Sequence, residues 1–132
     1  MSASDADTVR PLLLPWPDRK LHPNARVHWA PKAKATAAAR AAAGWETMAA
    51  GWNYVDWPDG DLFVWITFYP PDRRRRDTDG LLSSMKAALD GIAQTMGVDD
   101  RRFVPRPYLS DEVRPGGQVR VQVTGGPHEA KA

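Results

Sequence analysis

The sequence predicts an α/β (α+β) domain in which a small mixed β-sheet of about four strands carries two main helices. Two observations lead to this fold class. Residues 62–69 form a short run of aromatic and β-branched residues that is typical of a strand. Residues 80–96 carry apolar residues at alternating spacings of three and four, which is the pattern of an amphipathic helix. A chain of 132 residues suits a single domain, spanning residues 1–132, with a modest core.

The N-terminal half is predicted to hold an edge strand and a long helix. Val9–Leu14 has the composition of a strand, and Pro11 places it at a sheet edge because proline has no N–H to donate. Residues 15–30 follow as a loop. Residues 31–50 then form an alanine-rich helix that a proline opens and a glycine ends.

The middle of the chain is predicted to pass from a buried strand into the second helix. Leu62–Tyr69 is apolar on both faces, so we expect it to be a central strand. Residues 80–96 form one continuous helix, and Gly97 ends it. The core-facing stripe of this helix consists of Leu82, Met85, Leu89, Ile92 and Met96.

Two further strands, Phe103–Leu109 and Gln118–Thr124, are expected near the C-terminus, joined by a turn at residues 115–117. In the second of them valines alternate with polar residues, which predicts one exposed face. The two ends of the chain, residues 1–7 and 125–132, are expected to be flexible tails.

Composition excludes several classes of protein. Eighteen Lys and Arg against sixteen Asp and Glu give a net charge of +2, so this is no uniformly basic DNA-coating protein. The lack of cysteine excludes disulfides and thiolate metal sites and favours Mg²⁺, or Mn²⁺, as a metal. With no signal peptide and no long apolar run, we expect a cytoplasmic protein without membrane contact.

The strongest functional signal is a run of four arginines, Arg73, Arg74, Arg75 and Arg76, followed at once by Asp77 and Asp79. Two carboxylates one residue apart can converge on a hard cation such as Mg²⁺. Guanidinium groups match phosphate oxygens in bidentate geometry. The segment therefore suits metal-assisted attack on a phosphodiester. The alternative is a solvated loop in which the aspartates pair with arginines or cap a helix.

Further charged residues extend the candidate site. On a helix, Asp79, Ser83, Lys86 and Asp90 fall within roughly 60° of one another. Lys86 either reaches a phosphate at the metal site or pairs with Asp90 one turn along.

After the helix, Asp99 and Asp100 precede Arg101 at the start of a strand. They either complete a site for one or two Mg²⁺ ions or serve as ordinary turn residues.

Candidate DNA contacts outside this segment lie in the loop 15–30 and at the start of the first helix. They are Asn24, Arg26, His28 and Lys32. A single histidine in such a loop can equally be structural. Of the six tryptophans, most are expected in the core. Trp16 and Trp29, in the same loop, are candidates for stacking on bases.

These motifs resemble the RusA family of Holliday junction resolvases, which is found mainly in phages and prophages. The resemblance rests on Pro-Asp-Arg-Arg-Arg-Arg-Asp-X-Asp at residues 71–79, Lys-Ala-Ala-Leu-Asp-Gly-Ile at residues 86–92, and the pair at residues 99–100. The segments at residues 14–17 and 24–29 resemble the opening strand and loop of the family. The similarity covers nearly the whole chain.

Carried over by position, the resemblance places the metal-binding carboxylates on Asp77, Asp79 and Asp100, with Asp99 beside them. It places the essential lysine on Lys86. Two positions depart from the family pattern. The lysine of the best-known members would fall at Ser83, one turn earlier, and the residue after the second aspartate is usually Asn, whereas here it is Gly80.

The resemblance implies a homodimeric, Mg²⁺-dependent endodeoxyribonuclease that resolves four-way DNA junctions by paired symmetric nicks, in a bacterial cell or a phage-infected host. A two-fold dimer supplies two sites for two symmetric nicks. In this interpretation the arginines, Arg101 included, position the DNA backbone without reading sequence. Two alternatives stay open: a non-catalytic accessory protein that binds branched DNA, and a less selective nuclease for flaps or forks.

Overall fold

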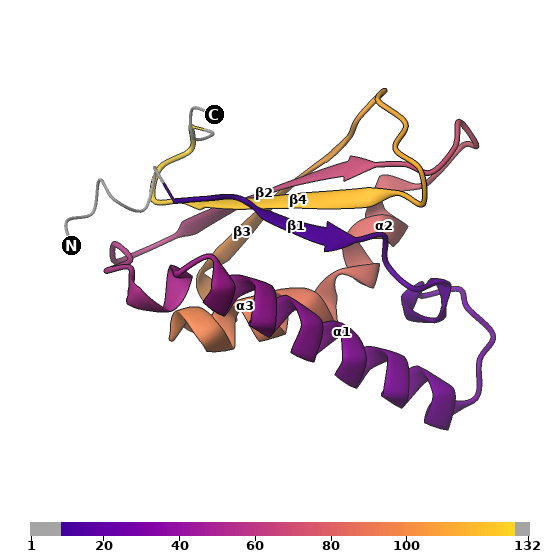
Figure 1. Ribbon diagram of the computed structural model, residues 1–132, viewed down its shortest axis with the longest axis horizontal. Helices are drawn as coiled ribbons and strands as arrows, with labels where there is room; N and C mark the ends of the chain where they lie inside the picture. The colour runs from indigo at the N-terminus through magenta and orange to yellow at the C-terminus, as the bar shows by residue number, and fades with distance from the viewer. Residues whose placement is uncertain (1–8, 129–132) are drawn as a thin grey trace.

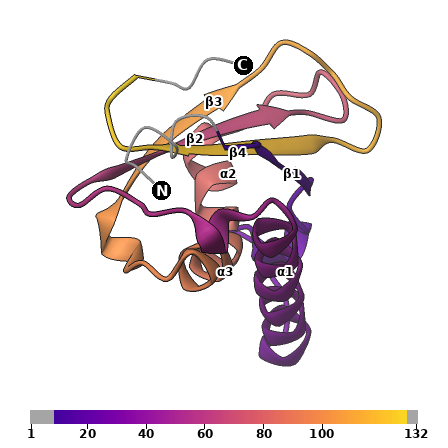
Figure 2. The same ribbon diagram turned by 60° about the vertical axis from the view of Figure 1, so that its left-hand side comes forward.

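The computed structural model describes residues 9–128 and confirms the α+β class (Figure 1). A four-stranded mixed sheet has the order β1-β4-β2-β3, and the helices α1, α2 and α3 lie on one face of it, as Figure 2 also shows. The strands are β1 (Leu12–Pro15), β2 (Leu62–Tyr69), β3 (Phe103–Leu109) and β4 (Gln118–Thr124). The α-helices are α1 (Trp29–Ala49), α2 (Thr78–Ser84) and α3 (Lys86–Met96). Three short 3₁₀ turns are η2 (Arg19–Leu21), η3 (Trp52–Tyr54) and η4 (Asp100–Arg102).

The central position predicted for residues 62–69 is confirmed. β2 pairs in parallel with β3 and antiparallel with β4. Its alternate residues Leu62, Val64, Ile66 and Phe68 are fully buried under the helices. The residues between them are half-buried on the opposite face, which carries no helix (Figure 1). The opposite face of β2 also carries large apolar rings, Phe63, Trp65 and Tyr69, although no helix covers it.

The first two predicted elements are found with shifted boundaries. β1 begins at Leu12 and not at Val9, and it is an edge strand as Pro11 predicted. α1 begins at Trp29, two residues before Pro31, because proline is tolerated within the first turn of a helix. It ends where Gly51 adopts a positive φ of 79°. No helix in the described residues is long and apolar enough to cross a membrane.

The single helix predicted over residues 80–96 is wrong: two helices meet at Met85. α2 starts before Gly80 because the Asp77 side chain caps it, accepting a hydrogen bond from the Asp79 backbone N–H at 3.1 Å. The Met85 N–H then bonds to the Leu82 carbonyl at 3.0 Å, a tighter turn that breaks the α-helical ladder. The stop at Gly97 is confirmed by its φ of 76°.

The predicted strands β3 and β4 are present, but they are not neighbours in the sheet. β2 lies between them, so the loop 110–117 carries the chain across β2. The exposed face predicted for β4 is also partly wrong, because Gln122 and Thr124 are buried. Trp65 is the register partner of Gln122 and donates from Nε1 to the Thr124 hydroxyl at 2.8 Å. A large ring on the neighbouring strand thus shields polar residues from solvent.

β3 forms the long outer edge of the sheet and contains two prolines. Pro105 and Pro107 are paired in register with Val64 and Ile66. Proline nitrogens cannot donate to a neighbouring strand, so the ladder with β2 is kept only if both nitrogens face outward. The outer edge therefore lacks two backbone donors.

The termini lie largely outside the described residues. Residues 1–8 and 129–132, which hold most of the two predicted tails, are not described by the structure.

Candidate functional site

The arginine-rich loop after β2 is organised around Asp72. The Asp72 carboxylate accepts hydrogen bonds from the Arg74 side chain and backbone and from Arg76 Nη2 at 2.8 Å. The hydrogen bonds from Arg74, then that from Arg76, lower the pKa of Asp72 well below its ordinary value. The same pairing raises the pKa of Arg74. One carboxylate therefore fixes the shape of the loop.

Arg76 differs from the other three arginines that were predicted to contact DNA. Its side chain is only 15% exposed and also donates to the backbone carbonyls of Asp72 and Arg74. Its guanidinium lies 5.4 Å from the ring centre of Trp16, in cation–π range. Arg76 therefore anchors the loop to the body of the protein.

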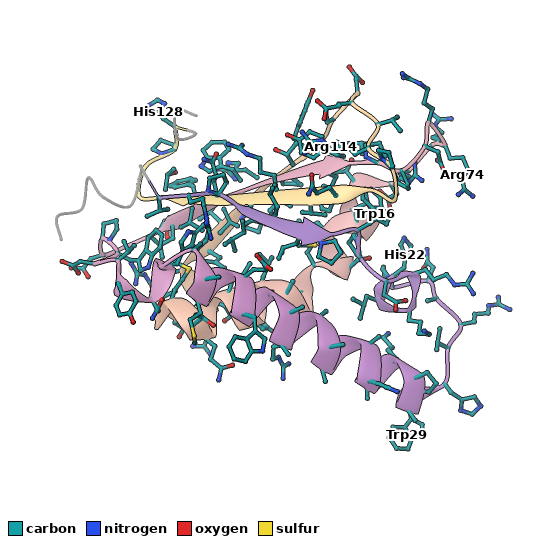
Figure 3. All side chains as sticks on the ribbon, in the orientation of Figure 1. Trp16, His22, Trp29, Arg74, Arg114 and His128 are labelled. Carbon is teal, nitrogen blue, oxygen red and sulfur yellow. The ribbon has the colours of Figure 1, made fainter. Side chains whose placement is uncertain are left out.

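The other three arginines reach solvent. Arg73, Arg74 and Arg75 are exposed, and Figure 3 shows Arg74 at the outer tip of the loop. Within residues 9–128, Arg73 and Arg75 take part in no ion pair. Their positive charge is therefore available to an anionic partner.

Replacing Asp72 by Asn is expected to lower the melting temperature at neutral pH. The sign follows from the lowered pKa: the native state gains stability once Asp72 ionises, above about pH 4, and loses it as pH falls through the lower native pKa. The difference between wild type and variant should therefore shrink from pH 7 towards pH 2 in thermal melts. Asp111→Asn, at an exposed carboxylate outside the loop, is the control and should change little. A pH-independent difference would contradict this assignment.

Asp77 and Asp79 lie together at the start of α2, as the sequence suggested. Asp77 is the N-cap, so the helix-capping interpretation of this residue is confirmed. Asp77 also lines a cavity of about 540 Å³ between the loop after β1 and the arginine-rich loop. Arg19, His22, Arg75 and Arg76 line the same cavity, with Trp16 and Leu81 among its apolar walls. Two carboxylates, those of Asp18 and Asp77, and several cations thus share one space.

Lys86 opens α3 and lies in a neighbouring groove of about 310 Å³. Ser83, Lys86 and Asp90 line this groove together, so three of the four residues of the predicted strip share one space despite the break at Met85, whereas Asp79 does not line it. Lys32 and Arg40 line its other wall, from α1. Asp90 pairs with Arg40 at 4.0 Å. Ser84 lines both this groove and the Asp77 cavity, so the two spaces are neighbours.

Asp99 and Asp100 lie apart from Asp77 and Asp79. Asp100 comes just before Phe103, which pairs with Leu62 at the beginning of β2, whereas Asp77 follows the end of β2. The two pairs of aspartates are therefore at opposite ends of the parallel strand pair. Among residues 9–128, no three His, Asp or Glu side chains are grouped closely enough to hold a metal ion. The predicted set of Asp77, Asp79 and Asp100 is thus not assembled within one chain.

Asp100 instead lies beside Asp90. A hydrogen-bonding contact with Asp90, then loss of solvation, then the charges of Asp90 and Asp99 raise the pKa of Asp100. Asp99 caps η4, accepting from the Arg101 backbone N–H at 2.9 Å. Three carboxylates therefore crowd this corner of the protein.

Replacing Asp100 by Asn is expected to raise the melting temperature at pH 7. Because the native pKa of Asp100 is raised, the folded protein loses stability as the pH rises above the ordinary pKa of aspartate. Ionisation of Asp100 then places like charges close together. The gain should vanish below about pH 4, where the carboxyl is protonated in both states. Thermal melts from pH 4 to 8 test this, with the exposed Asp59→Asn as control. A lower melting temperature at pH 7 would show that the Asp100 charge is stabilising.

The remaining predicted DNA contacts are all exposed. Asn24, Arg26 and His28 belong to the loop before α1, and Lys32 lies in the first turns of α1. Trp29, at the free end of α1, is 79% exposed and points away from the body of the protein (Figure 3). Arg101 lies in η4, beside the distant acidic corner. The loop and the arginine-rich segment flank the Asp77 cavity, and Arg101 does not.

Asp18, Arg19 and His22 line the cavity but were not predicted from the sequence. His22 follows η2 and lines the cavity together with Asp77. Its Nδ1 accepts a hydrogen bond from the Asn24 backbone N–H at 3.1 Å. The sequence feature that could have indicated His22 is its place in the same loop as the candidate contacts Asn24, Arg26 and His28.

No family model matches the sequence. A protein of Xylella fastidiosa (strain Temecula1 / ATCC 700964), described as an uncharacterized protein, is 48% identical over 118 residues, which cover 89% of this chain and 77% of the relative. Identity at this level extends over most of both proteins. The chain therefore belongs to the same family as this Xylella fastidiosa protein.

Proposed function

We propose that the protein is a Mg²⁺-dependent endonuclease that cuts branched DNA, acting as a homodimer on four-way junctions. The observation that carries the proposal is the Asp77 cavity, in which a carboxylate lies among arginines at the end of an exposed arginine-rich loop. Arginine binds phosphate, and a carboxylate in the same space can hold the cation that a phosphodiester-cleaving site uses. The resemblance of residues 71–100 to resolvases is the reason for proposing branched DNA as the substrate and a homodimer as the active form.

Asp77 and Asp79 would hold the cation. The donor set fits Mg²⁺, or Mn²⁺, because Mg²⁺ is commonly bound by one or two carboxylates, with water and substrate phosphates as the other ligands. When bound, such a cation neutralises charge on the phosphate and activates water for attack. Within one chain, Asp99 and Asp100 are too remote to join this pair.

The cationic residues around the cavity would hold the DNA backbone. Arg75 and Arg19 line the cavity, and Arg73 is exposed two residues before Arg75. Lys86 lies in the adjacent groove, where it can bind a neighbouring phosphate. Contacts of this kind fix the register of a duplex without reading its sequence. Selectivity would then come from the shape of the branch point.

The test is a cleavage assay on a synthetic four-way junction labelled on each strand in turn, with Mg²⁺ and with EDTA. Paired nicks at symmetric positions, seen on a denaturing gel only with Mg²⁺, are the expected result. Competition with linear duplex separates a junction-selective enzyme from a general nuclease for flaps or forks. Equal cleavage of both substrates would refute the junction selectivity.

A second candidate function is a branched-DNA-binding protein without nuclease activity. The observation that favours it is the separation of Asp99 and Asp100 from Asp77 and Asp79. A tight complex in a gel-shift assay, with intact strands after prolonged incubation with Mg²⁺ or Mn²⁺, would establish it.

A further inference from the structure

The imidazole of His22 occupies the space in which residue 80 would carry a side chain. A Cβ atom placed on Gly80 would lie 2.5 Å from His22 Nε2 and 3.2 Å from His22 Cε1. The same Cβ would lie 3.3 Å from Asp77 Oδ2. Real Cβ atoms do not approach other atoms as closely as 2.5 Å. The imidazole of His22, from a distant loop, and the Asp77 carboxylate therefore both border the space left empty at Gly80.

The hydrogen bonds around this contact fix what each group offers. Because His22 Nδ1 accepts the Asn24 N–H, the proton of the neutral ring lies on Nε2. Nε2 is thus a donor, and it is the imidazole atom nearest the Gly80 position. Asp77 uses Oδ1 to accept the Asp79 N–H, and its other oxygen, Oδ2, is the one beside Gly80. A donor and an acceptor therefore flank the same small space.

We propose that His22 is a positioning residue for the Asp77 carboxylate, and that Gly80 is glycine in order to admit the imidazole. The proposal rests on the proposed function in that Asp77 is taken as a cation ligand. Oδ1 accepts the Asp79 backbone N–H, and the imidazole N–H lies on the Oδ2 side of the carboxylate, so the histidine favours the orientation in which Oδ2 faces Gly80. Each oxygen keeps a lone pair for a cation.

The expected size of the effect follows from this role. Groups that orient a ligating carboxylate typically change metal affinity or activity by about 10–100-fold when removed. They leave the chemistry of the ligand itself intact. The fold should also tolerate the loss of His22, because its side chain is only partly buried and belongs to a loop.

The experiment breaks the contact from both sides and then restores a donor. Mn²⁺ affinity is measured by electron paramagnetic resonance for wild type, His22→Ala and Gly80→Ala. Both variants should bind Mn²⁺ about 10–100-fold more weakly, with nearly unchanged melting temperatures. Gly80→Ala acts by displacing the imidazole, whose tip can move. The matched control is His128→Ala, at an exposed histidine that follows β4 and does not line the Asp77 cavity, which should bind Mn²⁺ like wild type.

The rescue variant separates positioning from a merely structural role. In His22→Ala/Gly80→Asn the asparagine amide places a new N–H donor in the vacated space beside Asp77 Oδ2. His22→Ala raises log Kd for Mn²⁺, and the double variant should reverse at least about a third of that rise. A purely structural role for His22 predicts no recovery. A second readout needs no cation: the ¹⁵N shift of His22 Nε2 should move in Asp77→Asn.

The outcomes distinguish the two proposals. If His22→Ala and Gly80→Ala bind Mn²⁺ like wild type, or if the Nε2 shift is unmoved in Asp77→Asn, the positioning role is overturned even when wild type cuts junctions. If Mn²⁺ affinity depends on His22 but no branched DNA is cut, the positioning role stands and the nuclease proposal falls.

Discussion

Asp77→Asn is expected to slow cleavage of a four-way junction by about a thousandfold or more while leaving junction binding as tight as in wild type, or tighter. The substitution removes one negative charge from a cavity lined by arginines, so it takes away a cation ligand and a source of repulsion for phosphate. Asparagine is the right replacement because it also serves as a helix N-cap. The start of α2 should therefore be preserved.

Single-turnover cleavage with Mg²⁺ and gel-shift binding with Ca²⁺ measure the two effects separately. Asp111→Asn, which removes the same charge from an exposed position outside the cavity, is the matched control. A folded Asp77→Asn protein that loses binding together with cleavage would show that the carboxylate organises the DNA site. Cleavage at the wild-type rate would remove Asp77 from the chemistry.

Trp52→Ala is expected to cost about 3–5 kcal/mol of folding stability. Trp52 is 0% exposed, and its indole N–H donates to the Arg10 carbonyl at 2.8 Å. Its ring packs edge-on against Trp57, with centroids 5.6 Å apart. The substitution leaves a large void and an unpaired carbonyl. Since the free energy of unfolding of such domains is only about 5–15 kcal/mol, the substitution would remove a large fraction of the total stability.

Urea unfolding followed by circular dichroism measures this loss. Trp45→Ala makes the same chemical change on the outer face of α1, where the ring is 71% exposed, and it should shift the unfolding free energy by less than about 0.5 kcal/mol. A small effect at Trp52 would mean that the core collapses into the space left by the ring.

The parts of the fold that the sequence predicted are those encoded by local periodicity. β2, the presence of α1 and the stop at Gly97 each follow from a pattern within one segment. The break at Met85 was invisible because the apolar stripe runs through it, and the capping bond of Asp77 decides where α2 begins. The order of β3 and β4 was missed because strand neighbours depend on pairing across the whole chain.

The candidate site divides in the same way. Asp77 and Asp79 are adjacent in sequence, so their shared location was predictable. Which arginine turns inward was not, because Arg76 is held by Asp72 and the Trp16 ring, contacts that a run of identical residues does not reveal. His22 was missed because its importance depends on a glycine far along the chain. Proximity of that kind is a property of the fold.

The prolines of β3 also limit how two copies of this protein can associate. A strand edge with N–H donors can be extended by another chain into a continuous sheet, which is a common route to fibrous aggregates. With Pro105 and Pro107 facing outward, the long edge of this sheet cannot bind a further strand in regular register. The homodimer proposed above would therefore form at surfaces other than the β3 edge, and a continuous sheet between two copies could only use the opposite edge, β1.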